Sequence, residues 1–123
     1  MSISTSCRVA AAALGLLLSG TAIAGAPVSG GWAVVTADGR LGPNTNVVKV
    51  HHKNAGIYRV EFNNDVSRCA TNVTLAAHDG KTITPGYVVV EHNKTTPNQV
   101  RVFTFLSTTL VASDFKFNLL VNC

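Results

Sequence analysis

Four histidines are the residues of this chain whose chemistry most readily suggests a site, because imidazole is the commonest protein ligand of transition metals. His51 and His52 are neighbours in a stretch that reads as a β-strand, so their side chains point to opposite faces and do not chelate one ion together. Glu91 and His92 have the same geometry. His78 falls in a turn and could meet His92 only through the tertiary fold. The sequence favours solvated surface histidines, and we expect no metal site and no cofactor.

Catalytic groups are as poorly supported as metal ligands. No G-x-S-x-G motif surrounds any serine. Three of the four aspartates lie in turn sequences, where an aspartate commonly binds its own backbone. A hydrolase would need carboxylates or histidines that converge in a cleft, and nothing in the sequence indicates such a cluster. We therefore predict no catalytic residue and no enzymatic activity; the carboxylates considered are Asp38, Asp65, Asp79, Glu61 and Glu91.

Groups that contact ligands without reacting are easier to find. Trp32 is the only tryptophan, and it is either a packing aromatic or a platform for a ligand. Two polar segments, 94–98 and 107–109, are rich in the hydroxyls and amides that contact sugars or partner backbones, although any solvated turn has the same composition. The candidate ligand-binding residues are Trp32, Lys94, Thr95, Asn98 and Thr108.

The N-terminal segment from Met1 to Ala24 has the composition of a secretory signal. Arg8 is its only charge, an apolar run from Val9 to Leu18 follows, and Ala22-Ile23-Ala24 matches the small-x-small pattern of signal peptidase sites. The apolar run is too short to span a bilayer, which takes about 20 residues. We expect cleavage after Ala24 and a secreted protein, periplasmic or extracellular, with no membrane span. The alternative is an uncleaved amphiphilic N-terminal helix.

Cleavage at this position removes Cys7 and leaves Cys69 and Cys123 as the only possible pair. Two cysteines in a small exported domain most often form a disulfide. Such a bond would add about 4 kcal/mol in the chain-entropy model. Two free thiols, or an intermolecular bridge through the terminal Cys123, are the alternatives.

Composition and charge narrow the class of protein further. The net charge of +4 falls to +3 without Arg8, and no run of Lys or Arg is present, so we expect neither a nucleic-acid arm nor a membrane-binding patch. From Gly25 onward valines outnumber leucines 16 to 6, a β-branched bias typical of strands. We assign 25–30 to a short lead and 31–123 to one domain.

Short apolar runs separated by Gly, Asn, Asp or Pro predict seven to eight strands. Asp38-Gly39 predicts a two-residue hairpin turn, and Arg40 to Asn46 reads as a loop. Tyr87 to Glu91 is nearly all apolar, which indicates a strand buried on both faces or one in the middle of a sheet. Ser107 to Ser113 fits either a hairpin or an edge strand. The fold expected is an all-β antiparallel sandwich with one disulfide; its strands are 31–37, 47–53, 57–62, 66–77, 87–91, 99–106 and 115–123.

Within three of these strands the alternation gives each residue a side. Tyr58, Val60 and Phe62 are expected inward, while Arg59 and Glu61 face water. Cys69 is in phase with the inward residues of 66–77. Cys123 is likewise in phase with the apolar side of 115–123, so the two sulfurs are expected on the same side of neighbouring strands.

Four blocks of sequence carry a resemblance to a family; they are Gly31–Gly39, Gly56–Ala70, Pro97–Val102 and Phe117–Cys123. Their order and spacing resemble a small disulfide-containing β-sandwich domain that recurs in bacterial secreted, surface and tail-fibre-like proteins. The resemblance covers about Gly31 to Cys123. It implies a binding or surface-display role, in a form that can be oligomeric, and brings no catalytic residues.

These expectations combine into a secreted or surface-exposed, non-catalytic binding module that recognises a glycan or protein partner. The alternative is a structural subunit of an extracellular oligomer or fibre. Such a homo-oligomer would assemble through exposed strand edges or outward apolar residues, for which Val47, Val89 and Leu120 are the candidates.

Overall fold

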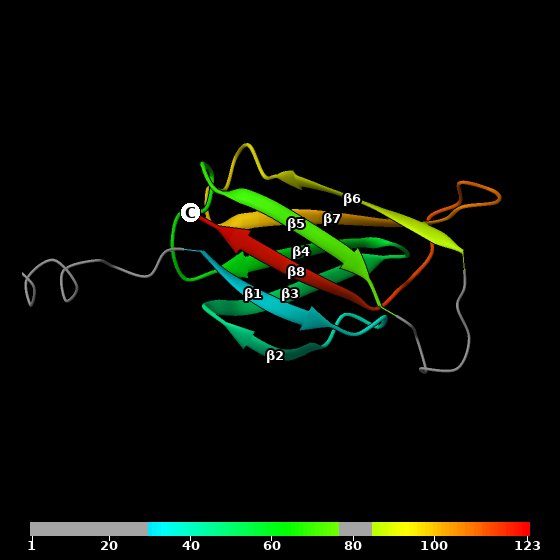
Figure 1. Cartoon of the computed structure of the whole chain (residues 1–123), viewed down its shortest axis with the longest axis horizontal. Coiled ribbons are helices and arrows are strands. Elements are labelled where there is room, and N and C mark those ends of the chain that lie inside the picture. The colour runs from blue at the N-terminus through cyan, green and yellow to red at the C-terminus, as the bar shows by residue number, and fades with distance from the viewer. Residues whose placement is uncertain (1–29, 77–84) are drawn as a thin grey trace, which may run out of the picture.

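The structure is a computed structural model that describes residues 30–76 and 85–123, and these residues form two antiparallel four-stranded sheets and no helix (Figure 1). No helix in this part of the chain is therefore long and apolar enough to cross a membrane. The expected signal segment 1–24, most of the lead 25–30 and the turn at His78 lie outside the described residues. The strands are β1 (Gly30–Val35), β2 (Leu41–Thr45), β3 (Val47–Asn54), β4 (Ile57–Phe62), β5 (Ala70–Leu75), β6 (Gly86–His92), β7 (Gln99–Leu106) and β8 (Phe117–Asn122).

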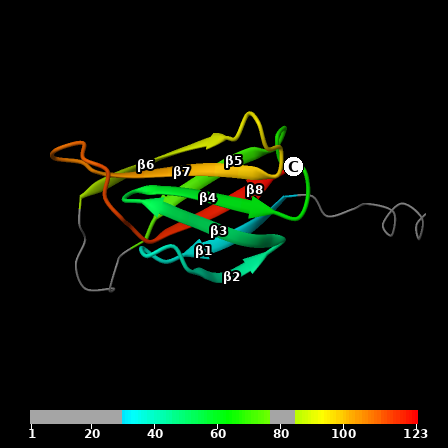
Figure 2. The same ribbon diagram turned by 180° about the vertical axis from the view of Figure 1, so that it is seen from behind.

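The two sheets pack as layers, and Figures 1 and 2 show them from opposite sides. Sheet A has the order β2-β1-β8-β5, and sheet B has the order β3-β4-β7-β6. The expected all-β sandwich is thus confirmed. Because side chains alternate along a strand, each sheet turns one set of residues into a shared core and the other set toward solvent.

Strand β4 shows this alternation most clearly. Tyr58, Val60 and Phe62 are fully buried, and Arg59 and Glu61 lie on the outer face, as the sequence predicts. Strand β8 has the same pattern in the opposite sheet. The core between the sheets is built from Ala33, Val35, Tyr58, Val60, Phe62, Val66, Cys69, Val100, Val102, Phe117, Leu119 and Val121.

The predicted disulfide joins Cys69 to Cys123, with their Cα atoms 4.4 Å apart. Cys69 precedes β5 and Cys123 follows β8, and these strands are antiparallel neighbours in which Ala70 pairs with Asn122. The disulfide therefore links β5 and β8 covalently, one residue beyond their last cross-strand pair. It fixes the end of β8, the strand that lies between β1 and β5.

The prediction of a loop from Arg40 to Asn46 is wrong, because Leu41–Thr45 forms β2. This strand carries Pro43, which a sheet tolerates at an edge where no ladder hydrogen bond is needed from the proline nitrogen. The turn before it is also longer than two residues. It runs from Thr36 to Arg40, with Thr36 N–H donating to the Arg40 carbonyl and Gly39 at a φ of 88°.

A β-bulge changes the phase of β3. The register shifts between Val47, which pairs with Phe62, and Lys49, which pairs with Glu61. The extra residue, Val48, is 57 % exposed, and Val47 packs against the core. The expectation that Val47 is an outward residue is therefore wrong.

Strand β6 is an edge strand of sheet B and is not buried on both faces. Tyr87 and Val89 on its outer side are 39 % and 47 % exposed, so its apolar run does not reflect a central position. The ambiguous segment 107–113 contains no strand. It turns back on the end of β7, where Ala112 forms an isolated antiparallel bridge with Phe105 and the Leu106 N–H donates to the Val111 carbonyl.

Breaking the Cys69–Cys123 bond should lower the free energy of unfolding by about 4 kcal/mol, because it closes a loop across 54 positions of the chain. Urea unfolding with and without a strong thiol reductant measures this loss. A variant with both cysteines changed to serine should be insensitive to the reductant. Equal stability of the oxidised and reduced wild type would mean that the disulfide is not needed to fix the end of β8.

Candidate functional site

The structure does not bring the five predicted ligand-binding residues together. Lys94, Thr95 and Asn98 lie in the loop between β6 and β7, at the start of β7, whereas Thr108 follows the other end of that strand (Figure 1). Trp32 belongs to β1, in the other sheet. No single binding site contains all five.

The polar groups of the β6–β7 loop are largely used within the protein. The Asn98 side-chain amide donates to the Phe62 carbonyl at 3.0 Å, and the Phe62 N–H donates to the Asn98 carbonyl at 2.8 Å. Thr95 donates from its hydroxyl and its N–H to the Asn93 side chain. The Asn98 bonds hold the loop against the end of β4, and the Thr95 bonds lie within the loop. Lys94 is its exposed cation.

Trp32 is 41 % exposed on the outer face of sheet A. It pairs across the sheet with Leu120 of β8, which is 50 % exposed and pairs in turn with Asn72 of β5. The next row along is formed by Val34, Asn118 and Thr74. We call this surface the Trp32 face; it is a shallow depression of about 380 Å³ lined by Trp32, Ala33, Val34, Asn72, Thr74, Asn118, Leu119 and Leu120.

The Trp32 face is uncharged and mixed in polarity, with Leu120 and Asn118 on its middle strand, Trp32 and Val34 on one side and Asn72 and Thr74 on the other. The side chains of Asn72, Thr74 and Asn118 make no hydrogen bond to any other described residue, so their donors and acceptors remain available to a ligand. The face exists because the outward positions of β1, β5 and β8 fall in register when their inward positions fill the core.

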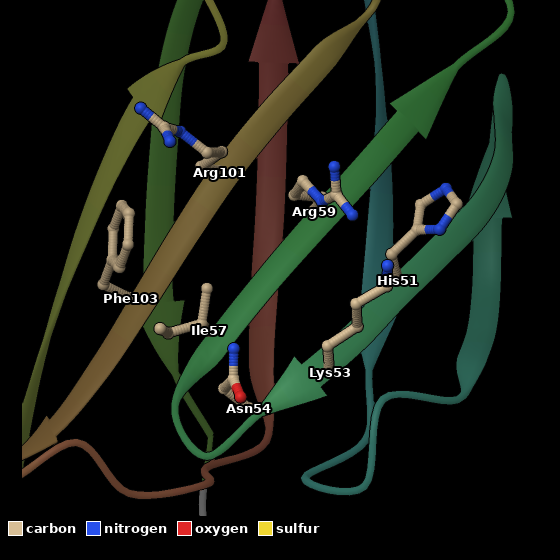
Figure 3. A pocket seen from close by; sticks show the side chains of 7 residues that line it. All are labelled: His51, Lys53, Asn54, Ile57, Arg59, Arg101 and Phe103. Carbon is tan, nitrogen blue, oxygen red and sulfur yellow. The ribbon is translucent and has the colours of Figure 1, made fainter.

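A second depression, of about 320 Å³, crosses the outer face of sheet B (Figure 3). Its side chains come from β3, β4 and β7. Three of the seven are cationic, namely Lys53, Arg59 and Arg101, and no carboxylate lines it. We call it the basic groove; it is lined by His51, Lys53, Asn54, Ile57, Arg59, Arg101 and Phe103.

The basic groove consists of two parallel rows. In the polar row, His51 pairs with Arg59, Arg59 with Arg101, and Arg101 with Glu91 on the edge strand. Arg101 forms an ion pair with Glu91. In the apolar row, Ile57 pairs with Phe103 and Phe103 with Val89.

Arg101 also connects the two rows, because its guanidinium lies 5.9 Å from the centre of the Phe103 ring. The sequence predicts that Arg59 lies on the outer face, but it contains no signal for the groove. Arg59 and Arg101 are far apart in the chain, and only the pairing of β4 with β7 makes them neighbours.

The two adjacent histidines point to opposite faces, as expected, but His52 is not a solvated surface residue. Its ring stacks on buried Tyr58, with centroids 4.4 Å apart and planes 9° from parallel. One Asp114 oxygen lies 2.9 Å from His52 Nε2 and accepts a hydrogen bond from the Gly56 N–H at 2.6 Å. The network ties the β3–β4 turn to the segment that leads into β8.

Electrostatics in this network favour a charged aspartate beside a neutral tyrosine. Burial acts to raise the pKa of Asp114, but the hydrogen bonds from Gly56 and His52 outweigh it, and the pKa lies below its usual value of 3.8. Burial, followed by the negative charge of Asp114, strongly raises the pKa of Tyr58. The phenol stays protonated and donates to the Ala37 carbonyl at 2.6 Å. We interpret the network as structural.

Within residues 30–76 and 85–123, no three His, Cys, Asp or Glu side chains are grouped so that they could hold a metal ion. His92 lies on the inner side of β6, where its Nε2 is buried without a hydrogen-bond partner in the described chain, and His51 lies on the outer face of sheet B.

A comparison with known proteins finds no match for the chain among protein-family models, curated proteins or solved structures. The resemblance to bacterial surface domains remains a prediction. The Trp32 face and the basic groove are the two surfaces whose geometry bears on function.

Replacing Asp114 with alanine should lower the free energy of unfolding at pH 7 by about 1–3 kcal/mol, because the Gly56 N–H and His52 lose their acceptor. The depressed pKa of Asp114 stabilises the fold at pH values above the unfolded pKa of about 4, and this contribution disappears as the pH falls through the lower folded value. Urea unfolding between pH 2 and pH 7 measures both effects.

The Asp114→Asn variant is the matched control, since its amide oxygen still accepts from Gly56 but carries no charge. It should lie between wild type and Asp114→Ala at pH 7 and show less loss of stability in acid than wild type. Identical acid limbs for wild type and Asp114→Asn would contradict this account.

Proposed function

We propose that this protein is a secreted, non-catalytic binding module that recognises a glycan through the Trp32 face. The exposed tryptophan that lines an uncharged surface bearing amide and hydroxyl groups is the observation that carries the proposal. Export is supported by the signal-like segment Met1–Ala24 and by the intramolecular disulfide, which persists mainly in oxidising compartments.

The chemistry of the Trp32 face suits a neutral sugar. An indole presents a flat, amphipathic surface on which the C–H side of a pyranose ring can stack. Asn118 lies diagonally across from the indole on β8, and Asn72 lies beyond Leu120 on β5. Neither amide bonds to another residue of the described chain, and each can donate to and accept from sugar hydroxyls. An uncharged lining matches a ligand without charge, and Leu120, the cross-strand partner of Trp32, extends the apolar surface beyond the indole.

The non-catalytic part of the proposal rests on the residues that line the two depressions. Neither lining includes a carboxylate, a cysteine or a serine. The one close histidine–carboxylate pair in the described chain, His52 with Asp114, is occupied by the β3–β4 turn.

The alternative function is a structural subunit. It is supported by the exposed apolar residues of the edge strands, among which Val48 of β3 and Val89 of β6 are 57 % and 47 % exposed. Unprotected apolar edges of this kind are sites where a second chain can add.

Replacing Trp32 with alanine should weaken binding to a neutral oligosaccharide by about tenfold or more, since stacking and apolar burial are lost together. A glycan array followed by calorimetry with cellohexaose and chitohexaose measures the loss. The melting temperature should change by only a few degrees, because the indole is half-exposed.

Tyr87→Ala is the matched control, because Tyr87 is an aromatic residue of similar exposure on the opposite sheet. It should leave neutral-glycan binding unchanged. If no neutral glycan binds, and light scattering after size exclusion finds a stable oligomer that Val89→Asp dissociates, the structural alternative replaces the proposal.

A further inference from the structure

We propose that the basic groove is a second binding site, separate from the Trp32 face, and that it takes the carboxylate or sulfate groups of an acidic polysaccharide. The two surfaces lie on the outer sides of different sheets, so one does not extend into the other. The proposal depends on the side chains of sheet B alone.

Like charges lie opposite each other in the polar row of the groove. Arg59 and Arg101 are direct cross-strand partners, and His51 extends the same row on β3. Like charges placed directly opposite each other in a sheet destabilise it. Figure 3 shows the two guanidinium groups turned away from each other, that of Arg101 toward β6 and that of Arg59 toward β3. An anion bound beside Arg59 would offset the repulsion that remains, so folding leaves a position there that favours negative charge.

The polar row already binds one carboxylate. Glu91 binds Arg101 at the β6 end of the row. Among residues 30–76 and 85–123, no carboxylate lies within ion-pair distance of Arg59 or Lys53. The guanidinium of Arg59 therefore offers its planar set of donors to a ligand, and this geometry suits carboxylate and sulfate oxygens.

An apolar row lies beside the charged residues. Ile57 and Phe103 lie next to each other beside the cationic residues (Figure 3). Val89, which pairs with Phe103, continues this strip onto β6. A sugar chain with acidic substituents presents both surfaces at once, with C–H groups for the strip and oxyanions for the arginines. The combination favours an acidic polysaccharide over a small free anion, which would leave the strip uncovered.

Two buried nitrogen atoms add to this picture. Arg101 Nε and His51 Nε2 are shielded from solvent and have no hydrogen-bond partner within the described chain. Buried donors and acceptors are normally satisfied. Small movements of the two side chains on binding would let these nitrogens pair with a ligand or its bound water. They lie on two of the three strands that line the groove.

The test measures the affinity of the folded protein for a heparin hexasaccharide and for oligogalacturonate by calorimetry, with a neutral dextran as the reference. Arg59→Gln should weaken binding to at least one of the acidic probes by about tenfold, the effect of losing a charge-assisted hydrogen-bond pair. Arg68→Gln is the matched control, since Arg68 is an exposed arginine in the turn beyond the far end of β4. It removes the same charge and should change the affinity by less than about twofold.

Glu91→Gln gives the opposite prediction. It releases Arg101 from its internal carboxylate, so affinity for the same probe should rise by about two- to fivefold. A gain in affinity does not arise from a variant that fails to fold, so this variant keeps the test decisive if Arg59→Gln is unstable.

Several results would overturn the proposal. Equal losses for Arg59→Gln and Arg68→Gln would mean that the probes respond to net charge alone. Tighter binding of poly-glutamate or duplex DNA would assign the groove to another class of macromolecule. Loss of acidic-probe binding in Trp32→Ala would place that binding on sheet A, whereas a Trp32→Ala effect limited to neutral glycans would leave the groove independent of the proposed function.

Discussion

The covalent link between Cys69 and Cys123 is the constraint on which the rest of the structure depends most. It fixes β8, the last strand, and β8 is what joins β1 to β5 in sheet A. The inward residues of β8, among them Phe117 and Leu119, fill the core, and its outward Leu120 completes the Trp32 face. Without a fixed β8, sheet A would divide into a hairpin and an isolated strand, and neither could cover sheet B.

Packing of the single core then determines what each outer face presents. Once the inward residues of β4 and β7 meet the opposite sheet, Arg59 and Arg101 have no position except side by side on the outside. The same constraint places Trp32 next to Leu120 on the other layer. One face is uncharged and aromatic, and the other is cationic with an apolar strip. The His52–Asp114 contact belongs to neither face and secures the end of the sandwich where the β3–β4 turn meets the chain entering β8.

Much of the fold could be predicted from sequence because alternation is a local signal. Alternation correctly predicts which residues of β4 and β8 point inward and on which side of their strands the two cysteines lie. Three features depend on non-local pairing and could not be predicted. The bulge at Val48 turns Val47 inward, β6 is apolar although it lies at an edge, and the Arg59–Arg101 pair exists only because β4 is hydrogen-bonded to β7. The candidate site was predicted less well, since loop composition pointed to Asn98 and Thr108, whereas Asn98 binds the end of β4 and it is Trp32 that lines the Trp32 face.

The central claim is that the two outer faces are separate binding surfaces of one rigid sandwich. Nuclear magnetic resonance of nitrogen-15-labelled protein, titrated in turn with a neutral and an acidic oligosaccharide, tests it most directly. The account predicts that the neutral ligand shifts the Trp32 indole N–H and the Asn72 and Asn118 amides, while the acidic ligand shifts the Arg59 and Arg101 Nε–H signals. Shifts of the same residues by both ligands, or of neither set by either ligand, would contradict it.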